Sequence, residues 1–323
     1  MSIVVVGSLN MDLVVRCKQL PVAGETVHGT GTAQVPGGKG ANQAAAAARL
    51  GIQTAMVGCV GNDSFGHTLK QSLTTVGVDV SAVQSSPRTT TGLALITVED
   101  SGQNTIIVDA GANNILSPAD IERATPQIAA ASLLLLQLEV PLTVVQAGIR
   151  IARQSNVRVL LNPAPVPTIA SLPDEIWQAD WLCPNESEAA KLTGINVNSA
   201  ATAIDAAAAL AKRNSGSVLV TLGHRGVLLA TPTECLHASA FKIRAVDATA
   251  AGDAFAAAFA VALAEGCTNS EAIRFASAAG AIAASRPGAS TSLPARADVE
   301  QLLDQQPHAA HLQPAHTANF WNP

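Results

Sequence analysis

A run of small residues that leads to an acid lies at 246–255, where the chain reads Val-Asp-Ala-Thr-Ala-Ala-Gly-Asp-Ala-Phe. An alanine-rich stretch, typical of a helix, follows to about Glu265. Small residues at a helix start leave backbone N–H groups open at the positive end of the helix dipole, which favours an anion such as phosphate. Asp253 could then accept the proton of an alcohol that attacks the phosphorus. An acid in a first helical turn is also an ordinary cap, so both interpretations remain open here.

A second glycine-rich stretch lies at 37–43, Gly-Gly-Lys-Gly-Ala-Asn-Gln, after Pro36 and before an alanine-rich helix. Glycines allow a ligand to approach the backbone closely. Lys39 adds a cation and Asn42 an amide near the helix start, a combination that suits a polyhydroxylated or phosphorylated ligand. The alternative is a tight turn with a solvated lysine.

Polar side chains follow several predicted strands, at the point where each strand ends. They are Asn10, Asp12, Glu139, Asn185 and Glu188. The carboxyl ends of parallel strands share one edge of a sheet, so we expect these groups to converge on one crevice. Taken singly, each is more often a helix cap, and Asn185 with Glu188 three residues later also matches a capping box.

Composition excludes several classes of protein. The 323 residues include 19 basic and 24 acidic ones, 3% are aromatic, and there is no tyrosine. The acidic balance and the absence of a basic cluster argue against nucleic acid or a membrane surface as partner. No P-loop, no GxGxxG after the first strand, no HExxH and no GxSxG occurs. The five cysteines show no CxxC spacing, and the N-terminus lacks the basic region of a signal peptide, so we expect a cytoplasmic protein.

Short apolar runs alternate with longer helical patterns, which predicts an α/β fold built on a buried, mostly parallel sheet. The expected strands are 2–6, 54–58, 132–137, 157–161, 180–183 and 217–221. The expected helices are 40–50, 64–76, 118–130, 141–155, 186–193 and 200–213.

Two stretches, 12–35 and 89–109, show strand alternation without an intervening helix. We expect them to form one small β-sheet that serves as a lid over the ligand edge; the alternative is that they are edge strands of the main sheet. The main α/β domain would then comprise 1–11, 36–88 and 110–304. Residues 305–323 have a polar composition typical of a flexible tail, and we assign them no function.

Taken together, these segments resemble the PfkB-type carbohydrate kinase family from about residue 2 to residue 300. The matching motifs are Gly7–Asp12, Gly24–Thr26, Gly37–Gln43, Gln137–Glu139, Leu161–Pro165, Pro184–Glu188, Thr221–Gly223 and Asp247–Asp253. The resemblance implies a three-layer α/β/α domain with a small β-sheet lid. This chain differs from the family's common residues at Ala248, Ala254, Ala256 and Ala257, and none of these differences removes a charged group.

The resemblance further implies ATP-dependent phosphorylation of D-ribose at O5 to D-ribose 5-phosphate. Asp253 would be the general base, and Ala250, Ala251 and Gly252 would form the anion hole. The sugar would be held by Asn10, Asp12, Gly38, Lys39, Asn42, Glu139 and Asp253.

Nucleotide and cation sites are implied in the same way. The ATP-binding residues would be Asn185, Thr221, Gly223, Gly252 and Ser277. Glu188 would hold Mg²⁺ through water, which suits an ion that keeps its hydration shell. An activating K⁺ would be held mostly by backbone carbonyls at Asp247, Thr249, Ala283, Arg286, Gly288 and Ser292.

Two other functions remain open on the sequence. One is a kinase of 2-deoxyribose or of another small sugar or nucleoside, because the residues that sense a single hydroxyl group are not visible in the sequence. The other is a non-catalytic regulator that binds sugar. We also expect a homodimer that pairs through the lid, since exposed sheet edges favour association.

Overall fold

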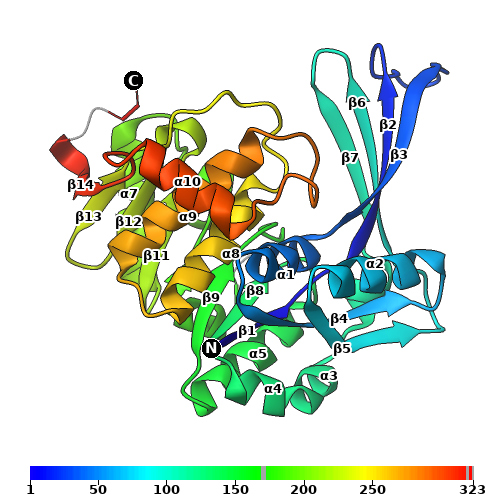
Figure 1. Cartoon of the computed structure of the whole chain (residues 1–323), viewed down its shortest axis with the longest axis horizontal. Helices are drawn as coiled ribbons and strands as arrows, with labels where there is room; N and C mark the ends of the chain where they lie inside the picture. Colours follow the sequence, from blue (N-terminus) through cyan, green and yellow to red (C-terminus); the bar gives the residue numbers. More distant parts are fainter. Residues whose placement is uncertain (169–171, 318–319, 322–323) are drawn as a thin grey trace.

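The computed structural model describes residues 1–168, 172–317 and 320–321. Over these residues a sheet of ten strands runs through the body of the molecule (Figure 1). In spatial order the strands are β14 (Leu312–Pro314), β13 (Cys235–Ala238), β12 (Val227–Ala230), β11 (Ser217–Thr221), β10 (Trp181–Leu182), β9 (Arg158–Asn162), β8 (Leu133–Gln137), β1 (Ser2–Val6), β4 (Gln53–Gly61) and β5 (Val78–Ser86). Neighbours from β11 to β5 pair in parallel, and β11 to β14 pair antiparallel. The expected mostly parallel sheet is confirmed.

Helices cover both faces of this sheet because both faces of its strands are apolar. Leu133 and Leu135 of β8 enter one hydrophobic cluster, and Leu134 and Leu136 enter the other. The first face is covered by α1 (Lys39–Arg49), α2 (Ser64–Thr75), α8 (Ala251–Ala264), α9 (Asn269–Ala284) and α10 (Arg296–Gln305). The second is covered by α3 (Pro118–Arg123), α4 (Thr125–Ala130), α5 (Leu142–Gln154), α6 (Glu186–Thr193) and α7 (Ala200–Arg213). The result is the expected three-layer α/β/α domain.

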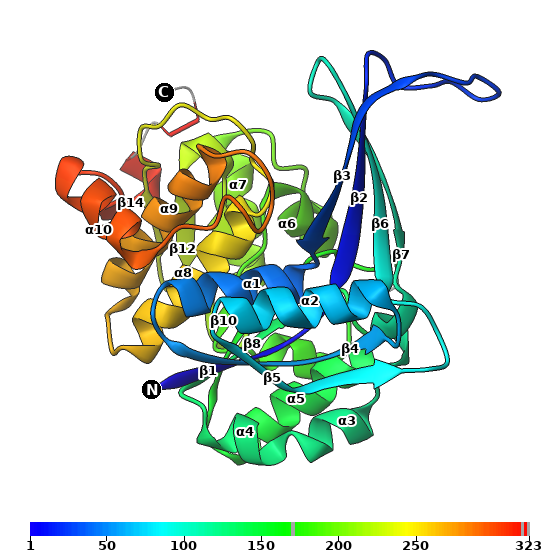
Figure 2. The ribbon, with the colours of Figure 1, turned by 45° about the vertical axis from the view of Figure 1, so that its right-hand side comes forward.

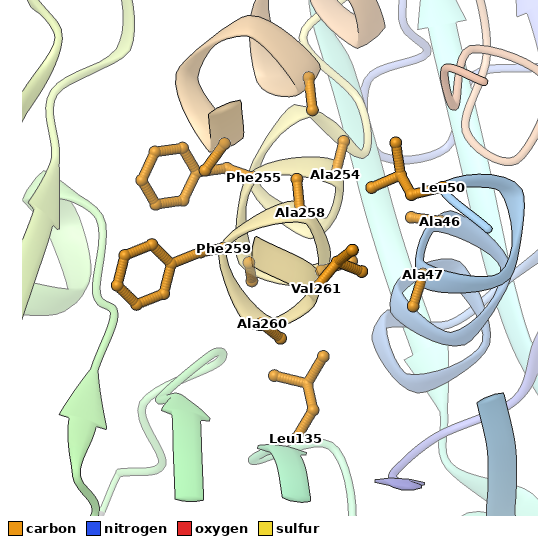
Figure 3. Close-up of a cluster of buried hydrophobic side chains, with 14 of the residues drawn as sticks. Ala46, Ala47, Leu50, Leu135, Ala254, Phe255, Ala258, Phe259, Ala260 and Val261 are labelled. Carbon is orange, nitrogen blue, oxygen red and sulfur yellow. The ribbon is translucent and has the colours of Figure 1, made fainter. Parts of the chain in front are cut away.

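Helix α8 is buried on all sides, and Figure 3 shows its side chains meeting α1 and strand β8. Its alanines lie against the small residues of α1, while Phe255 and Phe259 stack on the other side with ring centroids 6.4 Å apart. Small residues allow helix axes to come close. Each alanine buries little area, but the helix as a whole makes many contacts because it is packed on all sides. The start of α8, which carries Gly252 and Asp253, is therefore held by a rigid core.

The two β-rich stretches meet in a separate sheet. Within the described residues it has four strands in the order β3 (Gly29–Gly37), β2 (Asn10–Cys17), β6 (Gly92–Glu99) and β7 (Asn104–Asp109). Strands β2 and β6 pair in parallel, and the two hairpins β2–β3 and β6–β7 are antiparallel. Figure 2 shows these strands standing out from the body of the molecule. The alternative that they extend the main sheet is wrong, and we refer to them below as the small sheet.

The C-terminal residues correct one prediction. Residues 305–323 were expected to form a flexible tail, but β14 pairs with β13, and Ala310, Ala315 and Phe320 are buried. The strand satisfies the backbone groups along the edge of β13, and the scattered apolar residues pack inward. Residues 318–319 and 322–323 lie outside the described residues.

A second correction concerns the helix expected at 118–130, which is divided into α3 and α4. Pro126 lies in the first turn of α4, where its missing N–H breaks no helical hydrogen bond. Among the helices of the described ranges, none is long and apolar enough to cross a membrane.

Candidate active site

A cavity of about 210 Å³ lies where the parallel strands of the main sheet end. Asn162 ends β9, Asn185 follows β10 and Thr221 ends β11, so the side chains come from successive strand ends, as parallel topology requires. The complete lining is Lys39, Asn162, Ala164, Cys183, Asn185, Glu188, Thr221, Ala248, Ala250, Gly252 and Asp253.

The start of helix α8 forms one wall of this cavity. Its N-cap, Ala250, has the left-handed conformation with φ 60°, which is unfavourable for a residue with a Cβ and is retained here by the surrounding structure. The N–H of Ala251 already donates to the carbonyl of Ala248 at 3.1 Å. A Cβ built on Gly252 meets no described atom within 4 Å, so this glycine faces open space. First-turn N–H groups lack helical acceptors, which suits this wall to an anion.

The Asp253 carboxylate is held from the opposite side by helix α1. Asn42 Nδ2 donates to Oδ2 at 3.0 Å, and Gln43 Nε2 donates to Oδ1 at 2.9 Å. Gln43 Nε2 also donates to Asn162 Oδ1 at 3.2 Å, and Gln43 Oε1 accepts from Gln137 Nε2. Because both carboxylate oxygens are occupied by fixed amide donors, the carboxylate has a defined orientation at the cavity wall.

Burial raises the pKa of Asp253 above its ordinary value. The charge of Lys39 and the hydrogen bonds from Asn42 and Gln43 oppose that increase, because each favours the ionised form. For Lys39 the balance is reversed: burial alone would lower its pKa, but Asp253, Glu139 and Glu188 raise it, so the ammonium stays charged. A buried acid beside a cation is an arrangement suited to proton transfer.

Glu139 lies beside the glycine-rich turn. Its Oε2 accepts from Ser8 Oγ at 2.5 Å and from the Lys39 backbone N–H at 3.0 Å. Ser8 Oγ in turn accepts from the Gly40 N–H at 3.3 Å. The start of α1 is thus joined to the ends of β1 and β8.

Asp12 of β2 lies against Gly37 of β3, so closely that a Cβ at residue 37 would overlap its carboxylate. Burial, Glu139 and Asp253 together raise the pKa of Asp12 to about 7. Asn10, on the same strand, accepts at Oδ1 from Asn113 Nδ2 at 2.7 Å. Three carboxyl groups and Lys39 therefore influence one another where the small sheet meets the main domain.

Asn185 and Glu188 form the capping box that was kept as an alternative. Asn185 Oδ1 accepts from the Glu188 N–H at 2.9 Å, and Glu188 Oε2 accepts from the Asn185 N–H at 2.8 Å. Both residues also line the cavity, and burial raises the pKa of Glu188. The capping function and a function in the cavity are compatible, because each carboxylate oxygen has a further lone pair.

The residues expected at the nucleotide are only partly brought together. Thr221 lines the cavity and bridges to Asn185. Gly223 begins the single 3-10 turn that follows β11, with φ 56°. Ser277 lies half-buried in α9 and is not among the residues that line the cavity.

The residues expected at K⁺ fall in two adjoining segments. Asp247 Oδ1 accepts from the Thr249 N–H at 2.9 Å, and Oδ2 accepts from the Gly288 N–H at 2.9 Å. Burial raises the pKa of Asp247, but these hydrogen bonds outweigh it, so the pKa lies below its ordinary value. Arg286 instead pairs with Asp298 at 3.1 Å, and Ser292 Oγ donates to the Ala289 carbonyl at 2.8 Å.

Sequence reasoning gave no function to several residues that hold the site. They are Ser8, Gln43, Asn113, Gln137 and Asn162. Gln137 and Asn162 are the last residues of β8 and β9. The search for polar residues at the carboxyl ends of predicted strands could therefore have found them. Gln43 ends the glycine-rich stretch 37–43, which was singled out without a function for this residue, and Asn113 lies in a 3-10 turn that no comparable pattern marks.

The fold and the cavity together are those of a phosphotransferase that acts on an alcohol, and comparison with known proteins gives the family. The family model described as pfkB family carbohydrate kinase matches residues 1–296, so the chain belongs to that family, as the resemblance implied. The chain is 38% identical over 304 residues to ribokinase of Haemophilus influenzae. The match covers 94% of this chain and 98% of that protein.

Two further comparisons bear on the substrate. Deoxyribokinase of Salmonella typhimurium is 37% identical over 260 residues, covering 80% of this chain and 85% of that protein. The structure of Arabidopsis thaliana ribokinase complexed with ribose and ATP matches with a TM-score of 0.85 and 35% identity, covering 93% of this chain and 98% of that one.

Proposed function

We propose that the chain transfers the γ-phosphoryl group of ATP to O5 of D-ribose and so forms D-ribose 5-phosphate. The observation that carries the proposal is the Asp253 carboxylate, which is fixed by Asn42 and Gln43 and lines the same cavity as Gly252 at the start of α8. The ribokinase relatives, matched over almost their whole length, support ribose as the acceptor.

In the proposed reaction Asp253 accepts the proton of the sugar hydroxyl as its oxygen attacks the γ-phosphorus of ATP. The predicted anion hole of Ala250, Ala251 and Gly252 stabilises charge on the transferred group through the start of α8. Since the N–H of Ala251 already has an acceptor, we assign the larger share to Gly252. Burial removes competing water and strengthens these electrostatic interactions.

The sugar is proposed to lie between the small sheet and α1. Asn42 Oδ1 is buried and has no hydrogen-bond partner among the described residues, so it can accept from a sugar hydroxyl. Asp12 and Glu139 add further acceptors, and Lys39 a donor, which suits a neutral polyol. Asn10 and Gly38 complete this proposed sugar site.

The donor chemistry of the cavity fits Mg²⁺ bound through water. Glu188 keeps a free lone pair on each carboxylate oxygen and faces the cavity. In the described ranges no group of three His, Cys, Asp or Glu side chains could hold a metal directly. When bound, Mg²⁺ neutralises phosphate charge. Glu188 orients hydrating water, and Asn185, Thr221 and Gly223 border the nucleotide, with Ser277 proposed on the adenine side.

We further propose that K⁺ binds beside the anion hole, mostly through backbone carbonyls, at Asp247, Thr249, Ala283, Arg286, Gly288 and Ser292. Asp247 already joins both segments of that set, so an ion there would stiffen the loop that leads into Ala250. Exchange of K⁺ for Na⁺ at constant ionic strength should lower activity and the melting temperature of the ATP-bound protein.

The central test is a coupled ADP-release assay over a panel that contains D-ribose, 2-deoxy-D-ribose, other pentoses and nucleosides. The highest kcat/KM is expected for D-ribose. A preference of about a hundredfold or more for another acceptor would replace ribose in the proposal. Ribose binding by calorimetry without any ADP release would instead establish a non-catalytic regulator.

We also propose a homodimer that pairs through the small sheet. Ile106, Ile107 and Val108 of β7 are 54%, 69% and 55% exposed, and Leu95 of β6 is 45% exposed. An apolar sheet edge of this kind favours pairing with a second copy. Light scattering at micromolar concentration should give twice the chain mass.

We place the protein in the cytoplasm, a proposal supported by its five free cysteines within the described residues.

A further inference from the structure

The C-terminal residues Phe320 and Trp321 lie outside the family match, which ends at residue 296. Trp321 nevertheless contacts the turn that follows β11, and Phe320 contacts β13. The Arg225 guanidinium lies 4.2 Å from the centroid of the Trp321 ring, and the Phe320 ring stacks on His237 with centroids 4.2 Å apart. Phe320 is buried and Arg225 is half-buried, although Gly223 and His224 of the same turn are exposed.

Arg225 joins two loops that border the active-site cavity. It belongs to the turn after Thr221, and it forms an ion pair with Glu186, the first residue of α6. Glu186 lies directly after Asn185, and both Asn185 and Thr221 line the cavity. Arg225 therefore links the β10 side of the cavity edge to the β11 side.

The aromatic contact fixes this link. The Arg225 side chain is 19% exposed, and its Nε has no hydrogen-bond partner among the described residues. A cation on an aromatic face gains energy mainly when it is shielded from water. His237 contacts the same turn, because its Nε2 donates to the Arg225 carbonyl at 2.7 Å. Phe320 covers His237, so the two C-terminal rings act on one turn.

We propose that Trp321 and Phe320 are positioning residues for nucleotide binding: they fix Arg225, and through it the two loops at the ATP edge of the cavity. The inference rests on the proposed function for the assignment of that edge to ATP. This function differs from that of β14, which extends the main sheet by pairing with β13. The pairing involves neither aromatic ring, so it does not explain their contacts.

The test uses the full chain with Trp321→Ala, the conservative Trp321→Tyr, and Phe320→Ala as a second variant. Trp321→Ala should raise KM for ATP about threefold to tenfold and leave KM for ribose within about twofold. Trp321→Tyr should restore most of the ATP affinity, since it keeps an aromatic face. Phe320→Ala should show the same selectivity for ATP, because Phe320 covers His237, which donates to the Arg225 carbonyl.

Arg213→Gln is the matched control. Arg213 lies 4.0 Å from the Trp177 ring centroid, a similar cation–π contact at the opposite end of the strands, so its loss should not change KM for ATP. A Trp321→Ala variant with unchanged KM for ATP, or with equal increases for both substrates, would overturn the inference.

Titration with a nonhydrolysable ATP analogue separates this inference from the proposed function. If the wild type binds the analogue but does not phosphorylate ribose, only the acceptor assignment fails, and weaker analogue binding by Trp321→Ala still supports the inference. If the wild type binds no analogue, both proposals fail. If wild type and Trp321→Ala bind it equally, the positioning role alone is wrong.

Discussion

Gln43 Nε2 donates to Asp253 Oδ1 at 2.9 Å, although 210 residues separate the two along the chain. Helix α1 thus delivers a fixed amide to the carboxylate at the start of α8. Gln43 is fully buried, and its own carbonyl accepts from Gln137. The orientation of the proposed base is therefore set by a buried chain of amides and not by solvent.

Replacement of the proposed base tests the reaction directly. Asp253→Asn should lower kcat by about three orders of magnitude, because an amide cannot accept the hydroxyl proton, while ribose binding stays measurable. Turnover is measured by ADP release and binding by calorimetry. Asp205→Asn, an exposed change on α7, is the control. Activity of Asp253→Asn within about tenfold of wild type would refute the assignment.

Gln43→Met should change the pH profile of the enzyme. The variant removes a hydrogen bond that favours the ionised carboxylate, so the pKa of Asp253 should rise. The acidic limb of kcat against pH should therefore move to higher pH. Gln146→Met, which removes a 3.0 Å hydrogen bond to the half-buried Glu175, is the matched control. Loss of activity with an unmoved acidic limb would mean that Gln43 is only structural.

Gly252→Ala should separate activity from stability. No described atom lies within 4 Å of a Cβ at residue 252, and alanine favours a helix over glycine by about 0.5–1 kcal/mol. The melting temperature should therefore stay equal or rise, while the methyl group obstructs the proposed phosphate position and lowers kcat/KM by about tenfold or more. Gly148→Ala, in the interior of α5 with 3.4 Å to Leu136, is the control. Full activity of Gly252→Ala would place the phosphate elsewhere.

Asp12 should make the free protein less stable as the pH rises. Its pKa is raised from 3.8 to about 7 by burial, Glu139 and Asp253, so between these values the folded chain binds more protons than the unfolded chain. The stabilisation is complete below the lower value and is lost as the pH passes through the higher one. Asp12→Asn should be more stable than wild type by about 1–3 kcal/mol at pH 8 and equally stable near pH 4.

Urea unfolding of both proteins across this pH range measures the difference. The amide keeps the size of the side chain but cannot ionise, so packing is nearly constant in the comparison. A stability difference that does not change with pH would show that Asp12 is not the titrating group.

Much of the fold follows from local pattern. The run Leu133–Leu136 is apolar at every position, which predicts a strand buried on both faces, and the strand lies at the centre of the sheet. Strands β5, β12, β13 and β14 were not predicted. β5 alternates weakly, and the other three are short and form the antiparallel side of the sheet, where pairing partners and not local propensity decide the structure.

The sequence by itself determined the alternation of strands and helices, and with it the edge at which Asn185 and Glu188 lie. The reason is that the side-chain period is a local property, and strands alternating with helices run parallel, so that their carboxyl ends share one edge. Only the tertiary structure decided that Gln43 meets Asp253, that Asp12 has a pKa of about 7, and that Trp321 covers Arg225. These relationships depend on burial and on distances between segments far apart in the chain, and neither quantity has a counterpart in residue order.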